Sequence, residues 1–171
     1  MPYFGSPKKS IMRKVIVALL FAITAAIAAN GQAAKSVYFE LGGPGLASFN
    51  FDTRFGARED GLGGRIGVGG FSIEGAGVVF IPVGLNYLLG KDGRNYFEIG
   101  AGVTPLIASE GFTEDGSTFT TTFGHVLFGY RMQPGNGGFT FRAFVSPIFG
   151  GFGFVPYYGG VSFGYKFGNR R

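Results

Sequence analysis

The stretch Ala47-Ser48-Phe49-Asn50-Phe51-Asp52-Thr53-Arg54-Phe55 alternates between two kinds of side chain. Its odd positions hold Ala, Phe, Phe, Thr and Phe, and its even positions hold Ser, Asn, Asp and Arg. Successive side chains of a β-strand point to opposite faces of the sheet. The pattern therefore predicts a strand with one apolar face and one polar face.

The same period of two recurs along the chain. Strong alternation covers residues 37–41, 96–104, 139–145 and 161–167, and weaker alternation covers residues 61–72, 77–89 and 118–131. The last of these loses phase near Gly124 and His125, where we expect a β-bulge. Turn signals such as Asp92-Gly93 separate the segments and favour tight hairpins. We expect an all-β chain of eight antiparallel strands in up-and-down order, closed into a barrel.

A secretory leader precedes this region. Arg13-Lys14 is followed by an apolar stretch at residues 15–29 and then by small residues, which is the layout of a cleaved signal peptide. We predict a signal peptide over residues 1–33 and a barrel domain over residues 34–171, with cleavage after Ala28 and an uncleaved membrane anchor as alternatives. Met12 also begins a conventional leader, so residues 1–11 are either an upstream extension of the start or a longer positive region.

Charge and cysteine content exclude several functions. Charged residues make up 15% of the chain, and four of the basic ones, Lys8, Lys9, Arg13 and Lys14, lie in the leader. Eleven basic and ten acidic residues then remain, scattered singly, which gives no electrostatic footprint for nucleic acid. The chain has no cysteine, which removes disulfides and thiolate chemistry.

The sparse charge on the polar faces indicates which face points outward. Each predicted strand carries about one or two charged residues, interspersed with glycines such as Gly100 and Gly164. The outer surface of a soluble barrel needs far more charge for solubility. A membrane barrel instead turns its apolar face to lipid and its polar face to the lumen. We therefore predict a transmembrane β-barrel, with a soluble secreted carrier of the lipocalin kind as the alternative.

The lumen of an eight-stranded barrel is just wide enough for side chains to fill it. Charges out of water are expensive unless they are paired. We therefore predict a polar plug in which three acidic residues neutralise three basic residues. The acidic members are Glu40, Asp52 and Glu98, and the basic members are Arg65, Arg142 and Lys166.

Four stretches carry a resemblance to a known family: VYFELGGPG at 37–45, IPVGLNYLLGK at 81–91, YFEIGAGVTP at 96–105 and YYGGVSFGYKF at 157–167. Together they resemble the small single-domain outer-membrane β-barrel proteins of the OmpX and OmpA transmembrane type. The resemblance implies a bacterial outer-membrane location, contact with outer-membrane lipid and insertion by the barrel-assembly machinery. That machinery reads an aromatic residue at the end of the final strand, a position that Phe167 matches, although residues 168–171 follow it.

Catalytic groups are scarce. His125 is the only histidine, and the nearby hydroxyls are those of Thr120, Thr121 and Thr122, with no serine two residues away and the acidic residues distant in sequence. Glycines 63, 64 and 67 are not followed by the Lys-Ser/Thr of a phosphate loop. We therefore expect no enzyme activity, no cofactor and no metal, with a lipid-modifying enzyme as the alternative.

The predicted function is that of a structural or surface-interaction protein. An even strand count places both chain ends on the periplasmic side, so the long connections at residues 106–117 and 147–156 would face outward and could contact a surface partner.

Overall fold

The computed structural model describes residues 34–73, 76–108 and 119–168. The predicted signal peptide, residues 1–33, lies outside them. Within the described residues, no helix has both the length and the apolar character needed to cross a membrane. The elements are β1 (Lys35–Gly42), the 3₁₀ turn η1 (Gly43–Gly45), β2 (Ala47–Arg54), β3 (Gly61–Ile73), β4 (Ala76–Phe80), β5 (Val83–Leu89), β6 (Asn95–Ala108), β7 (Phe119–Met132), β8 (Gly138–Val145), β9 (Ile148–Gly150), β10 (Gly153–Val155) and β11 (Gly159–Phe167).

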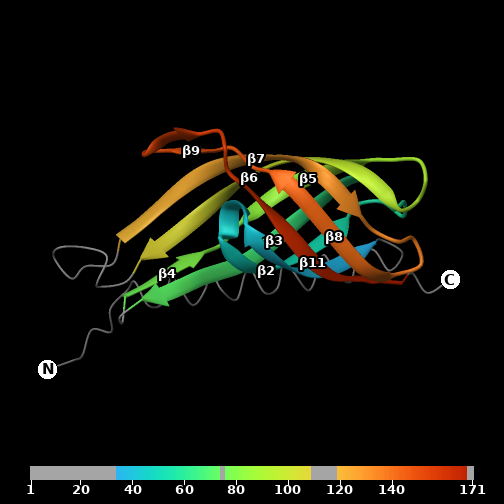
Figure 1. Ribbon diagram of the computed structural model, residues 1–171, viewed down its shortest axis with the longest axis horizontal. Coiled ribbons are helices and arrows are strands. Elements are labelled where there is room, and N and C mark those ends of the chain that lie inside the picture. Colours follow the sequence, from blue (N-terminus) through green and yellow to red (C-terminus); the bar gives the residue numbers. More distant parts are fainter. Residues whose placement is uncertain (1–33, 74–75, 109–118, 169–171) are drawn as a thin grey trace, which may run out of the picture. The chain divides into compact units, whose positions relative to one another are not determined.

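The strands form one closed antiparallel barrel (Figure 1). Closure is made by β1, which pairs with β2 on one side and with the last strand, β11, on the other. Strands β4 and β5 both lie between β3 and β6 in one register, so they are two parts of a single wall strand. Strands β8 and β9 likewise share one register against β7. The wall therefore has eight strands, which confirms the predicted fold class.

Prolines cause both interruptions. Pro82 separates β4 from β5 and Pro147 separates β8 from β9, and proline has no N–H to donate to the ladder. Their carbonyl groups still pair, because Gly67 N donates to Pro82 O at 2.8 Å and Val126 N donates to Pro147 O at 3.0 Å. The sheet stays continuous through both positions.

The two faces of the wall have the predicted character. A row of phenylalanines crosses four strands on the outer face, because Phe39 lies opposite Phe49 and Phe163, and Phe163 lies opposite Phe141. Phe49 is 70% exposed, whereas Asp52, on the other face of the same strand, is 1% exposed. Apolar rings thus face outward and ionic groups face inward.

The predicted bulge near Gly124 and His125 is absent from the described strands. β6 and β7 keep one register from Asn95 opposite Met132 to Ala108 opposite Phe119. The sequence pattern loses phase there because Phe123 and Leu127 are apolar but point into the barrel, where both are buried. The prediction of a bulge at this position was wrong.

A register slip occurs in the last strand instead. Val155 lies opposite Ile148, whereas Tyr158 O accepts a hydrogen bond from Ser146 N at 2.6 Å. Pro156 and Tyr157 therefore occupy the wall opposite Pro147 alone, as in a β-bulge.

The described parts of the two predicted outer connections belong to strands. β6 continues to Ala108, so residues 106–108 belong to the wall, and residues 109–118 lie outside the described residues. Within 147–156, β9 and β10 form a hairpin attached to β7. The backbone groups of these segments gain ladder partners, which an irregular loop would leave to water.

Candidate functional site

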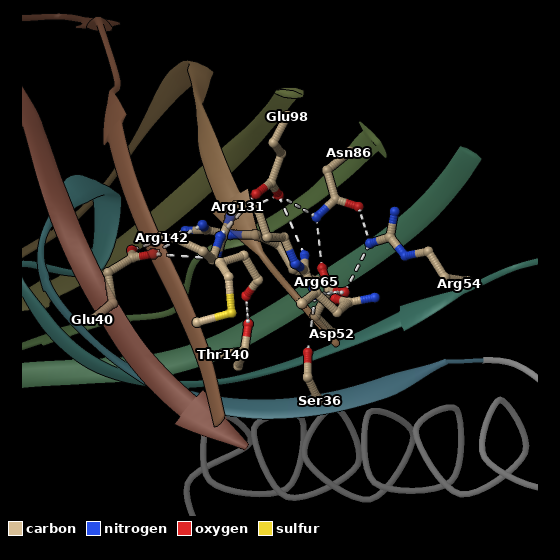
Figure 2. Close-up of polar contacts among 12 residues, drawn as sticks. Ser36, Glu40, Asp52, Arg54, Arg65, Asn86, Glu98, Arg131, Thr140 and Arg142 are labelled. Atoms are coloured by element: carbon tan, nitrogen blue, oxygen red, sulfur yellow. Dashed lines mark hydrogen bonds and ion pairs between the residues drawn. The ribbon is translucent and has the colours of Figure 1, made fainter. Parts of the chain in front are cut away.

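Charged side chains gather inside the barrel. The structure places all six residues of the predicted plug on inward faces, each no more than 5% exposed. They come from six strands: Glu40 from β1, Asp52 from β2, Arg65 from β3, Glu98 from β6, Arg142 from β8 and Lys166 from β11. Five of the six meet in one cluster, shown in Figure 2, and Lys166 does not.

Arg142 connects two carboxylates. Its Nε and Nη2 donate to the two oxygens of Glu98 at 2.8 and 2.7 Å, and its Nη1 lies 3.7 Å from Glu40. Arg65 donates to both Glu40 oxygens at 3.2 Å. The Arg142 guanidinium also lies over the Tyr38 ring, 4.6 Å from its centroid. Paired charges and an aromatic face thus replace the water that these groups lose.

Asp52 is the second centre of the cluster. Arg54 Nη2 and Arg131 Nη2 donate to Asp52 Oδ1 at 2.8 and 2.9 Å. The Asn86 amide donates to Asp52 Oδ2 at 2.6 Å and to Glu98 Oε1 at 2.8 Å, which joins the two centres. The full set, here called the ionic network, is Glu40, Asp52, Arg54, Arg65, Asn86, Glu98, Arg131 and Arg142.

Sequence reasoning left three members out of the plug. Arg54 lies on the polar face of the 47–55 stretch, but the sequence assigns it no partner, and Asn86 is an uncharged residue that a count of charges does not include. Arg131 was missed because its strand loses its polar alternation, although Arg131 is in phase with the inward residues His125 and Leu127. Counting in steps of two along the strand from His125 reaches Arg131, and this period was the signal that could have found it.

Lys166 has a different partner from the predicted one. It pairs with Glu59, in the connection between β2 and β3, and its Nζ donates to Pro134 O at 3.1 Å and Gly135 O at 2.6 Å. The predicted pairing with the strand carboxylates was wrong because Lys166 lies one residue from the end of β11, level with the turns. There it links the 55–60 connection to the 133–137 turn.

Close backbone approach makes room for these large side chains. A Cβ on Gly63 would lie 2.2 Å from Arg54 Cζ, and a Cβ on Gly164 would lie 2.2 Å from Val37 O and 2.4 Å from Tyr38 Cβ. Inward glycines therefore provide the space that the inward arginines and Tyr38 occupy.

Aromatic side chains gather at the barrel end that carries the β9–β10 hairpin. Phe80 and Phe123 meet edge-on at 6.5 Å between ring centroids, and Phe123 meets Phe152 at 6.0 Å. Phe71 lies 6.4 Å from Phe80. Phe123 is buried, whereas Phe71 and Phe152 are exposed, so these ring contacts run from the interior to the surface near the β9–β10 hairpin.

His125 points into the barrel and is buried. Its Nδ1 lies 3.3 Å from Thr104 Oγ1, a hydroxyl and not a carboxylate. Within the described chain, no group of three or more His, Asp or Glu residues could hold a metal ion. The described contact of His125 therefore lacks the acid that would orient a general base.

The predicted assembly residue, Phe167, is the last residue of β11. It lies opposite Lys35 of β1, and its ring is half exposed on the outer face, 5.8 Å from the Tyr165 ring. Its role in assembly stays a prediction.

Comparison with known proteins finds similar folds among solved structures but no matching family. No protein-family model matches the chain, and no curated protein sequence matches it. Among solved structures, the N-terminal β-barrel domain of Pseudomonas aeruginosa OprF is similar, with a TM-score of 0.59 and 12% identity over 79% of this chain and 96% of that one. At this level of identity the likeness shows the β-barrel fold alone. Ail, the attachment invasion locus protein of Yersinia pestis, gives a TM-score of 0.42 and 15% identity over 79% of this chain and 96% of that one.

Proposed function

We propose that the protein is an integral outer-membrane barrel with a structural or surface-interaction role, closed to ions and without turnover. The observation that carries this proposal is the inversion of the wall, with phenylalanines such as Phe49 and Phe163 outside and paired charges inside. A soluble carrier would present the opposite arrangement. The backbone ladder closes on itself between β1 and β11, as a barrel in lipid requires.

Labelling from the lipid phase tests the inversion. A photoactivatable lipid-soluble probe, followed by mass spectrometry, should modify Phe49, Phe51, Phe163 and Phe167 and should leave Asp52 and Lys166 unmodified. The protein should also fractionate with outer membranes and migrate differently on gels before and after heating. Recovery in the periplasmic fluid, or labelling of Asp52, would overturn the membrane assignment.

The filled interior argues against a pore. Arg131 of β7 pairs with Asp52 of β2 across the barrel, and Lys166 joins two turns at the barrel end. Planar bilayers containing the purified protein should therefore show no steady conductance. A stable open channel in the unmodified protein would refute this part of the proposal.

The β9–β10 hairpin is the proposed surface-contact region, together with the connection that follows β6. Phe152, Phe154 and Tyr157 are all exposed there, and the Tyr157 side chain is 98% exposed. Because the chain lacks cysteine, single cysteines report orientation cleanly. A membrane-impermeant maleimide added to intact cells should label Tyr157→Cys and should spare Lys91→Cys at the other end. The reverse pattern would place the hairpin in the periplasm.

A further inference from the structure

The charges in the ionic network do not balance. Four guanidiniums, those of Arg54, Arg65, Arg131 and Arg142, face the three carboxylates of Glu40, Asp52 and Glu98. All seven side chains are buried. Lys166 and Glu59 form a separate pair and leave this balance unchanged. A buried network with one excess positive charge is costly unless an anion accompanies it.

The excess is concentrated where β7 and β8 pair. Arg131 lies directly opposite Arg142, and both side chains point inward. Residues opposite each other in an antiparallel pair have Cβ atoms about 4.5–5.5 Å apart, and like charges there repel. Each arginine has its own carboxylate, Asp52 for Arg131 and Glu98 for Arg142. A negative charge near both guanidiniums would offset the remaining repulsion.

Buried hydrogen-bond donors of these arginines have no protein acceptor within the described chain. They include Nε and Nη1 of Arg131, Nη1 of Arg142 and Nε of Arg65. The nearest carboxylate oxygens lie 3.6 Å from Arg131 Nη1 and 3.7 Å from Arg142 Nη1, beyond hydrogen-bond distance. Among the described residues, the hydroxyl of Tyr38 and that of Ser162, which is directly opposite Arg142, have no hydrogen-bond partner either. Buried donors left without an acceptor destabilise a fold.

We propose that the ionic network binds one small monovalent anion, of chloride size, through the free N–H groups of Arg131 and Arg142. One such ion supplies the missing negative charge and accepts the unused hydrogen bonds together. The interior of an eight-stranded barrel is filled by side chains, which favours a compact halide over a larger oxyanion. This site goes beyond the proposed membrane role and holds whether or not the barrel contacts a surface partner.

Stability in different salts tests the site. The refolded barrel in a zwitterionic detergent is unfolded with urea in chloride and in gluconate at one ionic strength, so that screening is constant. Above the dissociation constant, each tenfold rise in chloride should lower the unfolding constant about tenfold. Equal stability in the two salts would overturn the proposal.

Two variants locate the effect. Arg131→Gln removes the excess charge and two of the free donors, while Asp52 keeps Arg54, so the chloride dependence should disappear. Arg58→Gln removes one positive charge from the exposed Arg58–Asp60 pair and should keep the full dependence. The same chloride dependence in Arg131→Gln, or its loss in Arg58→Gln, would contradict a site in the barrel.

Crystals of the unmodified protein grown in bromide provide a measurement that needs no variant. The anomalous signal should show a bromide in contact with the guanidiniums of Arg131 and Arg142. Only ordered water at these nitrogens would overturn the proposal, even if Arg131→Gln failed to fold.

Discussion

Replacing Glu98 by glutamine should destabilise the barrel strongly. Glu98 is 1% exposed and accepts two hydrogen bonds from Arg142 and one from Asn86. Glutamine has the same shape but no charge, and it presents an amide donor to a guanidinium that is already a donor. Breaking a buried ion pair from one side costs about 3–5 kcal/mol. Because Arg142 keeps a longer contact with Glu40, we expect a loss near the lower end, about 3 kcal/mol.

The assay is equilibrium unfolding in urea, with folded and unfolded fractions separated by gel mobility because the chain has no tryptophan. Arg142→Met and the Glu98→Gln/Arg142→Met double variant complete a cycle, which should give a coupling energy of about 2 kcal/mol. Asp60→Asn, in the exposed pair with Arg58, is the control and should leave the midpoint unchanged. If Glu98→Gln cost under about 1 kcal/mol and the cycle were additive, the ionic network would not be a stabilising unit.

Three further predictions concern the wall and a turn. Gly164→Ala would place a Cβ 2.2 Å from Val37 O, so we expect a loss of about 1–3 kcal/mol in the same unfolding assay, and a neutral result would contradict the close approach. Phe49 points outward, so under the proposed membrane location Phe49→Arg should cost about 2–4 kcal/mol in vesicles if it lies at the midplane, and no loss would exclude lipid contact there. Hydrogen bonds from the backbone N–H groups of Asn95 and Arg94 hold the pKa of Asp92 at about 2, below its ordinary value. The stabilisation from this turn is therefore present above pH 4 and lost as pH falls through 2, which an NMR titration of the carboxyl would show, whereas an ordinary pKa would refute it.

The sequence determined the outline of the fold through local periodicity. Side-chain direction alternates residue by residue, so the apolar and polar faces of residues 47–55 could be assigned without any tertiary contact. The low charge of the polar faces then predicted that the apolar face points outward, as the exposed Phe49 and the buried Asp52 confirm. The same reasoning placed all six plug residues inside the barrel.

Tertiary structure decided the register and the partners. The sequence cannot show that Arg131 lies opposite Arg142, because strand register depends on turn lengths and packing on both sides. Periodicity failed in β7, where Phe123 and Leu127 fill the interior and break the polar pattern without bending the strand. Lys166 pairs with Glu59 because the closed fold brings the 55–60 connection next to the end of β11 and to Gln133. Alternation along one strand fixes which side a residue faces, but only closure of the sheet brings side chains from different strands into contact.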